Sequence, residues 1–166
     1  TMEPNFTELS VQKGSIIASR FVGDTTEVSN AVKIAKWSGS LYFANAAYFE
    51  TKLLELISKN NEELKYIIVD VASIVQVDAS GEHVLRNLVE SCSDSGVEIL
   101  FARTERLEAE LYRSGFKKRF GENRFFDLRA DALKYVWQEI EDNEQEQKLD
   151  EEQDHILDID DGLNSA

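Results

Sequence analysis

The sequence has few of the residues that build disulfide frameworks, metal clusters or sharp turns. It contains one cysteine, Cys92, two histidines, His83 and His155, and a single proline among 166 residues. A lone cysteine excludes an internal disulfide framework and a cysteine-based zinc cluster, and two histidines exclude a multi-histidine metal site. No apolar run approaches the ~20 residues that a membrane-spanning helix needs, and no signal peptide opens the chain. We therefore expect this segment to be soluble and to bind no metal.

The charge is acidic and unevenly distributed. The chain has 32 acidic and 18 basic residues, which gives a formal net charge of −14. Residues 139–166 include 12 acidic residues and one basic residue, whereas residues 1–138 carry a nearly balanced charge of −3. Because phosphate groups would repel a chain of this charge, we expect no nucleic-acid partner.

Residues 143–166 are predicted to form a disordered acidic tail. This segment has too few apolar residues to bury enough surface to offset the entropy of ordering it. A short linear motif is the alternative interpretation, because four apolar residues fall loosely at helical spacing: Leu149, Ile156, Leu157 and Leu163.

The rest of the chain alternates between strand-like and helix-like patterns. We interpret residues 1–13 as a lead-in and residues 14–142 as one domain. Strands are predicted at 15–21, 32–37, 66–72, 97–102 and 124–128. Helices are predicted from Asn45, from Ser80 and from Thr104, and a last helix carries Leu133 to Ile140. This order predicts an α/β layered fold with a mixed central β-sheet and about four helices, in which the first two strands pair antiparallel.

No catalytic constellation is present in the sequence. Ser80 lies in a stretch that lacks the first glycine of a nucleophile elbow, and His83 falls in the first turn of a helix, where it faces solvent. Cys92 lies on the apolar stripe of the same helix and is predicted to be a buried, inert thiol. The glycines form neither a phosphate loop nor a dinucleotide fingerprint. We therefore expect no enzyme activity, no catalytic residues and no cofactor.

The segment Asp78-Ala79-Ser80-Gly81 stands out because it follows an apolar strand and opens a helix. Asp and Ser are preferred at such positions because their side-chain oxygens accept hydrogen bonds from unpaired amides. The alternative is a phosphoacceptor motif made of Asp78, Ser80 and Gly81. A phosphate on Ser80 would lie at a helix N-terminus, which favours negative charge, although Asp78 and Glu82 would repel it.

At these residues the sequence resembles a known family. The order of elements is similar to that of a STAS domain, named for sulfate transporters and anti-sigma-factor antagonists. Asp78-Ala79-Ser80-Gly81 resembles the Asp-Ser-Ser-Gly motif of the antagonists, with Ser80 on their phosphorylated serine and Ala79 in place of the first serine. The likeness covers about residues 30–141.

A second segment separates the branches of this family. STAS domains at the C-terminal end of SulP-family anion transporters have a segment that is similar to Gly39-Ser40-Leu41-Tyr42-Phe43-Ala44-Asn45-Ala46 of this chain. The resemblance implies a regulatory, non-catalytic module on the cytoplasmic face of the membrane, attached to a multi-span transport domain outside this segment. It also implies three partners, namely that transport domain, a second STAS copy and a cytosolic regulatory protein. Leu41, Tyr42 and Phe43 form an apolar strand-to-helix joint, and we expect at least two of them to fill the core. The alternative is that Leu41, Tyr42, Phe43 and Asn45 form a contact segment for such partners, through an exposed aromatic side chain.

A cluster of positive charge lies near the end of the domain. It consists of Arg113, Lys117, Lys118, Arg119 and Arg124. The cluster is interpreted either as solvated surface or as a patch that contacts anionic headgroups or a partner, with the acidic tail as one candidate. The alternative function of the whole chain is a free-standing anti-sigma-factor antagonist that is switched by phosphorylation of Ser80.

Overall fold

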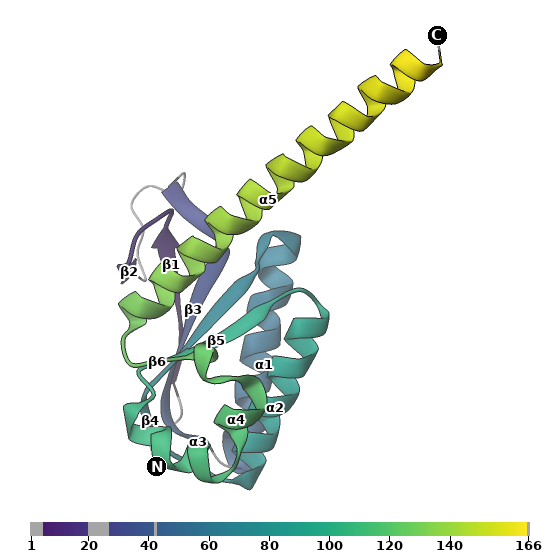
Figure 1. Ribbon diagram of the computed structural model, residues 1–166. Helices are drawn as coiled ribbons and strands as arrows, with labels where there is room; N and C mark the ends of the chain where they lie inside the picture. Colours follow the sequence, from purple (N-terminus) through teal and green to yellow (C-terminus); the bar gives the residue numbers. More distant parts are fainter. Residues whose placement is uncertain (1–4, 20–26, 42, 166) are drawn as a thin grey trace. The chain divides into compact units, whose positions relative to one another are not determined.

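The computed structural model describes residues 5–19, 27–41 and 43–165 of the chain (Figure 1). The chain divides into two compact units, residues 1–133 and residues 134–166. The first unit contains the whole β-sheet, and the second consists of most of one long helix. No helix within the described ranges is long and apolar enough to cross a lipid bilayer.

The sheet of the first unit is mixed, as the sequence predicts. Its strands follow the order β2-β1-β3-β4-β5-β6. β1 pairs antiparallel with both β2 and β3, whereas the neighbours from β3 to β6 pair in parallel. The strands are β1 (Asn5–Gln12), β2 (Ala18–Ser19), β3 (Val28–Leu41), β4 (Tyr66–Val77), β5 (Glu98–Ala102) and β6 (Phe125–Phe126).

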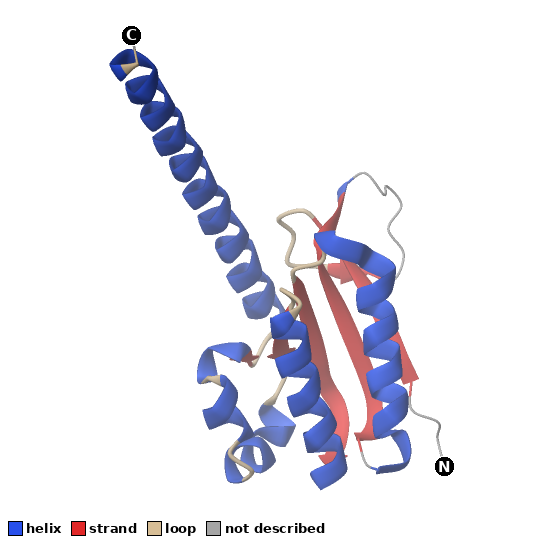
Figure 2. Cartoon of the chain, turned by 90° about the vertical axis from the view of Figure 1, so that its right-hand side faces the viewer, coloured by secondary structure: helices blue, strands red, loops and turns tan. Residues whose placement is uncertain are grey.

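Helices connect the parallel strands, and two of them lie side by side against one face of the sheet. These are α1 (Phe43–Asn60) and α2 (Ala79–Asp94), drawn in front of the strands in Figure 2. Shorter helices fill the connection between β5 and β6. They are η3 (Glu105–Leu107), α3 (Glu108–Arg113), α4 (Phe116–Phe120) and η4 (Glu122–Arg124), while η2 (Asn61–Glu63) follows α1. The predicted α/β layered fold with a mixed sheet is therefore confirmed.

The core lies between the sheet and these helices. Trp37 of β3 and Phe49 of α1 are both fully buried, and their rings meet edge to face with centroids 5.0 Å apart. The apolar stripe of α2 packs onto the same core through side chains that include Leu88 and Cys92. Burial of such side chains is the main favourable term in folding, so this layer stabilises the unit.

The N-terminal part of the sheet differs from the prediction. Residues 5–12, expected to belong to a lead-in, form β1, which lies between β2 and β3. The expected direct pairing of strands 15–21 and 32–37 is therefore wrong. β1 was missed because its buried apolar residues are only Leu9 and Val11 and its remaining positions are mostly polar. Such a pattern is too short to indicate a strand without its partners.

The acidic segment also differs from the prediction, because α5 (Arg129–Asn164) continues through it as a helix. The low apolar content of this segment indicates that it buries little surface, but a helix satisfies its backbone hydrogen bonds internally and can form without a core. Residues 143–164 contain no proline and include four Glu, three Gln and three Leu residues, which favour helix. The predicted domain end at residue 142 falls inside α5, whereas the first compact unit ends at Leu133.

Candidate functional site

The start of α2 is shaped by Asp78, which follows the last residue of β4. Asp78 has an extended backbone, with φ −88° and ψ 179°, and its Oδ1 accepts a hydrogen bond of 2.8 Å from the Gly81 amide. Its carbonyl accepts the first helical bond, at 2.9 Å, from the Glu82 amide. This is the geometry of an N-cap residue, so Asp78 satisfies amides that the helix start would otherwise leave unpaired.

Ser80 lies in the first turn of α2 and is half-buried. Within the described part of the chain its hydroxyl makes no hydrogen bond, so the oxygen is available to a modifying group. It lines a shallow groove between the N-terminal halves of the two helices, formed by Ala46, Ala47 and Glu50 of α1 and by Ala79, Ser80, His83 and Val84 of α2. A phosphate on Ser80 would be close to the α2 N-terminus, which attracts it, and to the carboxylates of Asp78 and Glu50, which repel it.

The residues considered for catalysis are not assembled into a reactive group. His83 is exposed, and its Nε2 lies 3.2 Å from Nδ2 of Asn87 rather than beside the Ser80 hydroxyl. Cys92 is buried as predicted, and burial raises the pKa of its thiol to about 11, so the thiol stays protonated at neutral pH. The described residues include no group of three or more His, Cys, Asp or Glu placed to hold a metal ion.

The predicted contact segment joins β3 to α1. Leu41 is the last residue of β3 and Phe43 is the first residue of α1, while Tyr42 lies outside the described residues. Asn45 is buried in the first turn of α1, two residues after the helix begins, so α1 starts earlier than the sequence predicts. The contact role of the segment stays a prediction.

The predicted basic cluster is spread over α3, α4 and η4, and three of its five residues are neutralised by neighbours. Lys117 Nζ lies 3.0 Å from Glu108, and Arg119 Nη2 lies 2.7 Å from Glu90. Arg124 pairs more loosely with Glu98, at 4.0 Å, and donates a hydrogen bond of 3.3 Å to the Ile99 carbonyl.

The other two members of the cluster, Arg113 and Lys118, are exposed and form no ion pair with any described residue. The exposed Tyr112 precedes Arg113 on α3, with 76% of its surface accessible. The uncompensated part of the cluster therefore consists of Arg113 and Lys118, and an exposed aromatic side chain lies next to Arg113 in the sequence.

Sequence reasoning missed a buried charge cluster at Asp70, in the middle of β4. The Asp70 side chain is fully buried between two arginines. Arg103, just after β5, donates from Nε to both carboxylate oxygens at 3.1 Å, and Arg129, the first residue of α5, donates to Oδ2 at 2.5 Å. The Ala72 amide adds a further bond of 3.0 Å. An aspartate inside the apolar run 66–72 was the available signal, since a buried carboxylate needs partners.

The electrostatics of this cluster favour the ionised carboxylate. Burial alone would raise the pKa of Asp70, but hydrogen bonds from the two guanidinium groups and the Ala72 amide outweigh it and hold that pKa below its ordinary value. Arg103 has a positive φ of 58°, a conformation that costs energy for any residue other than glycine. The chain therefore bends sharply at Arg103 while its side chain reaches Asp70, and the cluster joins β4, β5 and the start of α5.

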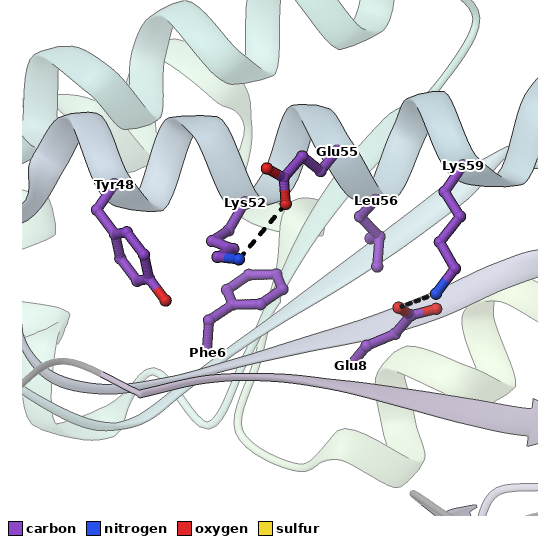
Figure 3. Close-up of a pocket in the computed structure, with 7 residues that line it drawn as sticks. All are labelled: Phe6, Glu8, Tyr48, Lys52, Glu55, Leu56 and Lys59. Atoms are coloured by element: carbon purple, nitrogen blue, oxygen red, sulfur yellow. Dashed lines mark hydrogen bonds and ion pairs between the residues drawn. The ribbon is translucent and has the colours of Figure 1, made fainter.

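A second groove lies between β1 and α1 and has a volume of about 280 Å³ (Figure 3). Its polar groups come in pairs: Lys59 lies 3.6 Å from Glu8, and Lys52 lies 3.5 Å from Glu55. The groove also contains the rings of Phe6 and Tyr48 and the side chain of Leu56. Because each lysine already faces a carboxylate, this groove offers no uncompensated charge to an ionic ligand.

The first unit is a layered α/β domain in which a shallow groove borders the start of α2, and a family match agrees with this fold. Residues 25–132 match the STAS domain model. The chain belongs to the STAS domain family. The resemblance predicted from Asp78-Ala79-Ser80-Gly81 and from the segment before α1 is thereby confirmed.

Two relatives come from the transporter branch. The chain is 31% identical to a sulfate transporter family protein from Wolinella succinogenes, with a TM-score of 0.59, over 67% of this chain and 88% of that one. It is 25% identical to high affinity sulfate transporter 2 from Stylosanthes hamata, over 60% of this chain. The match spans only 16% of the length of that plant transporter.

The fold itself is shared more widely. The murine Solute Carrier 26 family member A9 anion transporter has a TM-score of 0.66 at 22% identity, over 81% of this chain and 22% of that one. An anti-sigma factor antagonist from Thermotoga maritima has a TM-score of 0.55 at 19% identity, over 64% of this chain and 87% of that one. STAS domains of both branches therefore have the fold of residues 1–133.

Proposed function

We propose that this chain is the cytoplasmic regulatory STAS domain of a SulP-type secondary anion transporter, and that it acts through protein contacts without catalysis. The observation that carries the proposal is the 31% identity to a sulfate transporter family protein over 88% of the chain in that solved structure. The match to a plant sulfate transporter favours the same branch. Among the described residues no hydrogen bond joins the Ser80 hydroxyl to His83, whose Nε2 faces Asn87, which agrees with a module that is contacted rather than one that reacts.

The contacts proposed for this role involve the β3–α1 joint and the two unpaired members of the basic cluster, Arg113 and Lys118. The proposed partners are the transport domain of the same protein, a second STAS copy and a cytosolic regulatory protein. Arg113 of α3 and Lys118 of α4, which form no ion pair with a described residue, are the part of the cluster best suited to an anionic surface. Each charge near a membrane surface contributes about 1 kcal/mol to such an attraction.

The reading frame that encodes this chain provides the test. We expect the same frame to encode a multi-span hydrophobic region ahead of the STAS domain. Expression of that full-length protein in cells deficient in sulfate uptake should restore uptake of labelled sulfate or another anion. The double variant Arg113→Gln/Lys118→Gln should lower uptake at unchanged membrane abundance, and Lys134→Gln, an exposed lysine of α5, serves as the control. A frame with a stop codon and no hydrophobic region would overturn the proposal.

A second candidate is a free-standing anti-sigma-factor antagonist, which the half-buried, unbonded Ser80 hydroxyl at the start of α2 favours. In that case phosphate on Ser80 would switch binding of an anti-sigma kinase. Phosphopeptide mass spectrometry of the native protein separates the two candidates. The transporter proposal predicts a mostly unmodified Ser80, whereas near-complete phosphorylation there, with Ser93 of the same helix unmodified, would favour the antagonist.

A further inference from the structure

The C-terminal half of α5 carries an exposed apolar stripe. Leu149, Ile156 and Leu163 repeat every seven residues, and Ile159 lies between the last two. Their exposed fractions are 59%, 58%, 71% and 50%, respectively. Residues at this spacing share one face of a helix, and the pattern is that of a helix that packs lengthwise against another helix or into a groove.

The charge around this stripe is strongly acidic. Residues 143–166 contain nine acidic residues and one basic residue, Lys148. Glu152 lies on the apolar face itself, because it occupies the position three residues after Leu149 and four before Ile156. Any surface that covers the stripe must therefore accept a carboxylate in its centre and acidic side chains around it.

The acidic charge around the stripe determines which kind of surface can cover it. A second copy of α5 would place Glu152 against Glu152 inside the seam, and like charges that are partly desolvated repel strongly. An anionic membrane surface would likewise repel a segment of this charge. A partner whose apolar residues are bordered by Lys or Arg would cover the stripe and neutralise the carboxylates.

We infer that residues 149–163 of α5 form a docking helix for a basic, apolar-lined helix or groove on another protein. The stripe supplies the buried contacts, and Glu152 selects for a cation opposite it. This inference extends beyond the proposed function and does not rest on it, because it uses only α5 and holds for either branch of the family.

A binding experiment with the full chain tests the inference. The probe is a synthetic helical peptide of about four heptads, with Leu at the a and d positions that form the contact face and Lys beside them. The control peptide has Glu in place of every Lys. We expect the full chain to bind the Lys peptide and not the Glu peptide, and we expect rising salt to weaken the complex. Equal binding of both peptides, or no binding of the Lys peptide, overturns the inference.

Variants then locate the contact. The triple variant Leu149→Ala, Ile156→Ala and Leu163→Ala keeps strong helix formers and should weaken binding at least about tenfold, because apolar anchors carry most of an interface. Leu157→Ala is the matched control, since Leu157 is 60% exposed but lies off the stripe, and it should bind as the native chain does. Equal losses in both variants would overturn the inference.

Sedimentation equilibrium tests the alternative that the stripe binds a second copy of this chain. The triple variant should leave the oligomeric state of the native chain unchanged, because the stripe does not mediate self-association. Glu152→Leu removes the carboxylate from the seam and should create a new self-associated species through α5. A native oligomer that the triple variant dissociates would assign the stripe to a second copy and overturn the inference.

Discussion

Most large apolar side chains described in residues 1–133 are buried, whereas those in residues 143–164 are exposed. In the first region the large apolar residues, such as Trp37, Phe49 and Ile99, are buried. In the second, Leu149, Ile156 and every other large apolar side chain beyond residue 143 are at least half exposed. The first pattern makes a fold stable by itself, whereas the second leaves apolar surface for association.

Charge follows the same division. In the first region the buried carboxylate of Asp70 is matched by two arginines, and exposed cations such as Arg119 face a glutamate. In the second region, nine acidic residues after residue 142 face a single lysine. Compensated charge supports a unique packing, and uncompensated charge selects partners, so the two regions separate folding from recognition.

The largest effect is expected from Phe49→Ala. Phe49 is fully buried, and its ring contacts Trp37 edge to face. Removal of a buried aromatic ring should lower the free energy of unfolding by about 4 kcal/mol, because both transfer energy and packing are lost. Urea denaturation followed by tryptophan fluorescence measures this change.

The matched variant in the other region is Leu157→Ala, in which an exposed side chain of α5 is truncated. The same measurement should give a change within about 0.5 kcal/mol. If Phe49→Ala leaves too little folded protein to measure, Phe49→Leu should still show a clear loss. Similar losses for Phe49→Leu and Leu157→Ala would contradict the contrast between the two regions.

A smaller loss is expected from Asp70→Asn. This change removes the charge that Arg103 and Arg129 surround and leaves their guanidinium groups in a partly buried place. We expect a loss of about 3 kcal/mol, at the low end for a broken buried pair because both arginines still reach solvent. Asp131→Asn, an exposed aspartate of α5, is the control and should change little.

Acid titration gives an independent check of the Asp70 cluster. Its pKa is lower in the folded chain than the ordinary value of 3.8, so the folded state binds this proton more weakly than the unfolded state does. The stabilising contribution is therefore complete above about pH 4 and is lost as the pH falls through the folded pKa. Unfolding free energies measured from neutral to acidic pH should fall more steeply for the native chain than for Asp70→Asn. Parallel curves would contradict the assignment.

Periodicity was sufficient to predict the layers. The apolar run of β4 and the stripes of α1 and α2 indicated these elements because each buries one or both faces in the same core. β1 could not be predicted, because only Leu9 and Val11 signal it and its partners lie far along the chain. Helix in residues 143–164 was missed because low apolar content predicts the absence of a core and not the absence of helix.

The candidate site was predicted unevenly for a related reason. The motif at Ser80 is local, so the sequence indicated the start of α2. The cluster around Asp70 is assembled from residues 33 and 59 positions away, and no spacing rule joins them. The basic cluster was local in sequence, but its neutralisation by Glu90 and Glu98 depends on the packing of α4 and η4 against earlier elements.

The smallest effect is expected from Asp78→Ala, which compares one acidic residue of the first region with one of the second. Asp78 caps α2 through the Gly81 amide, so its loss should cost about 1 kcal/mol in the free energy of unfolding. Asp154→Ala removes an exposed carboxylate from a crowded acidic helix and should be neutral or slightly stabilising. Asp78→Asn keeps a capping oxygen and should recover most of the loss. Because Asn also removes the charge beside Ser80, recovery would show that the carboxylate serves α2 by accepting a hydrogen bond, whereas no recovery would mean that its charge matters more than its cap.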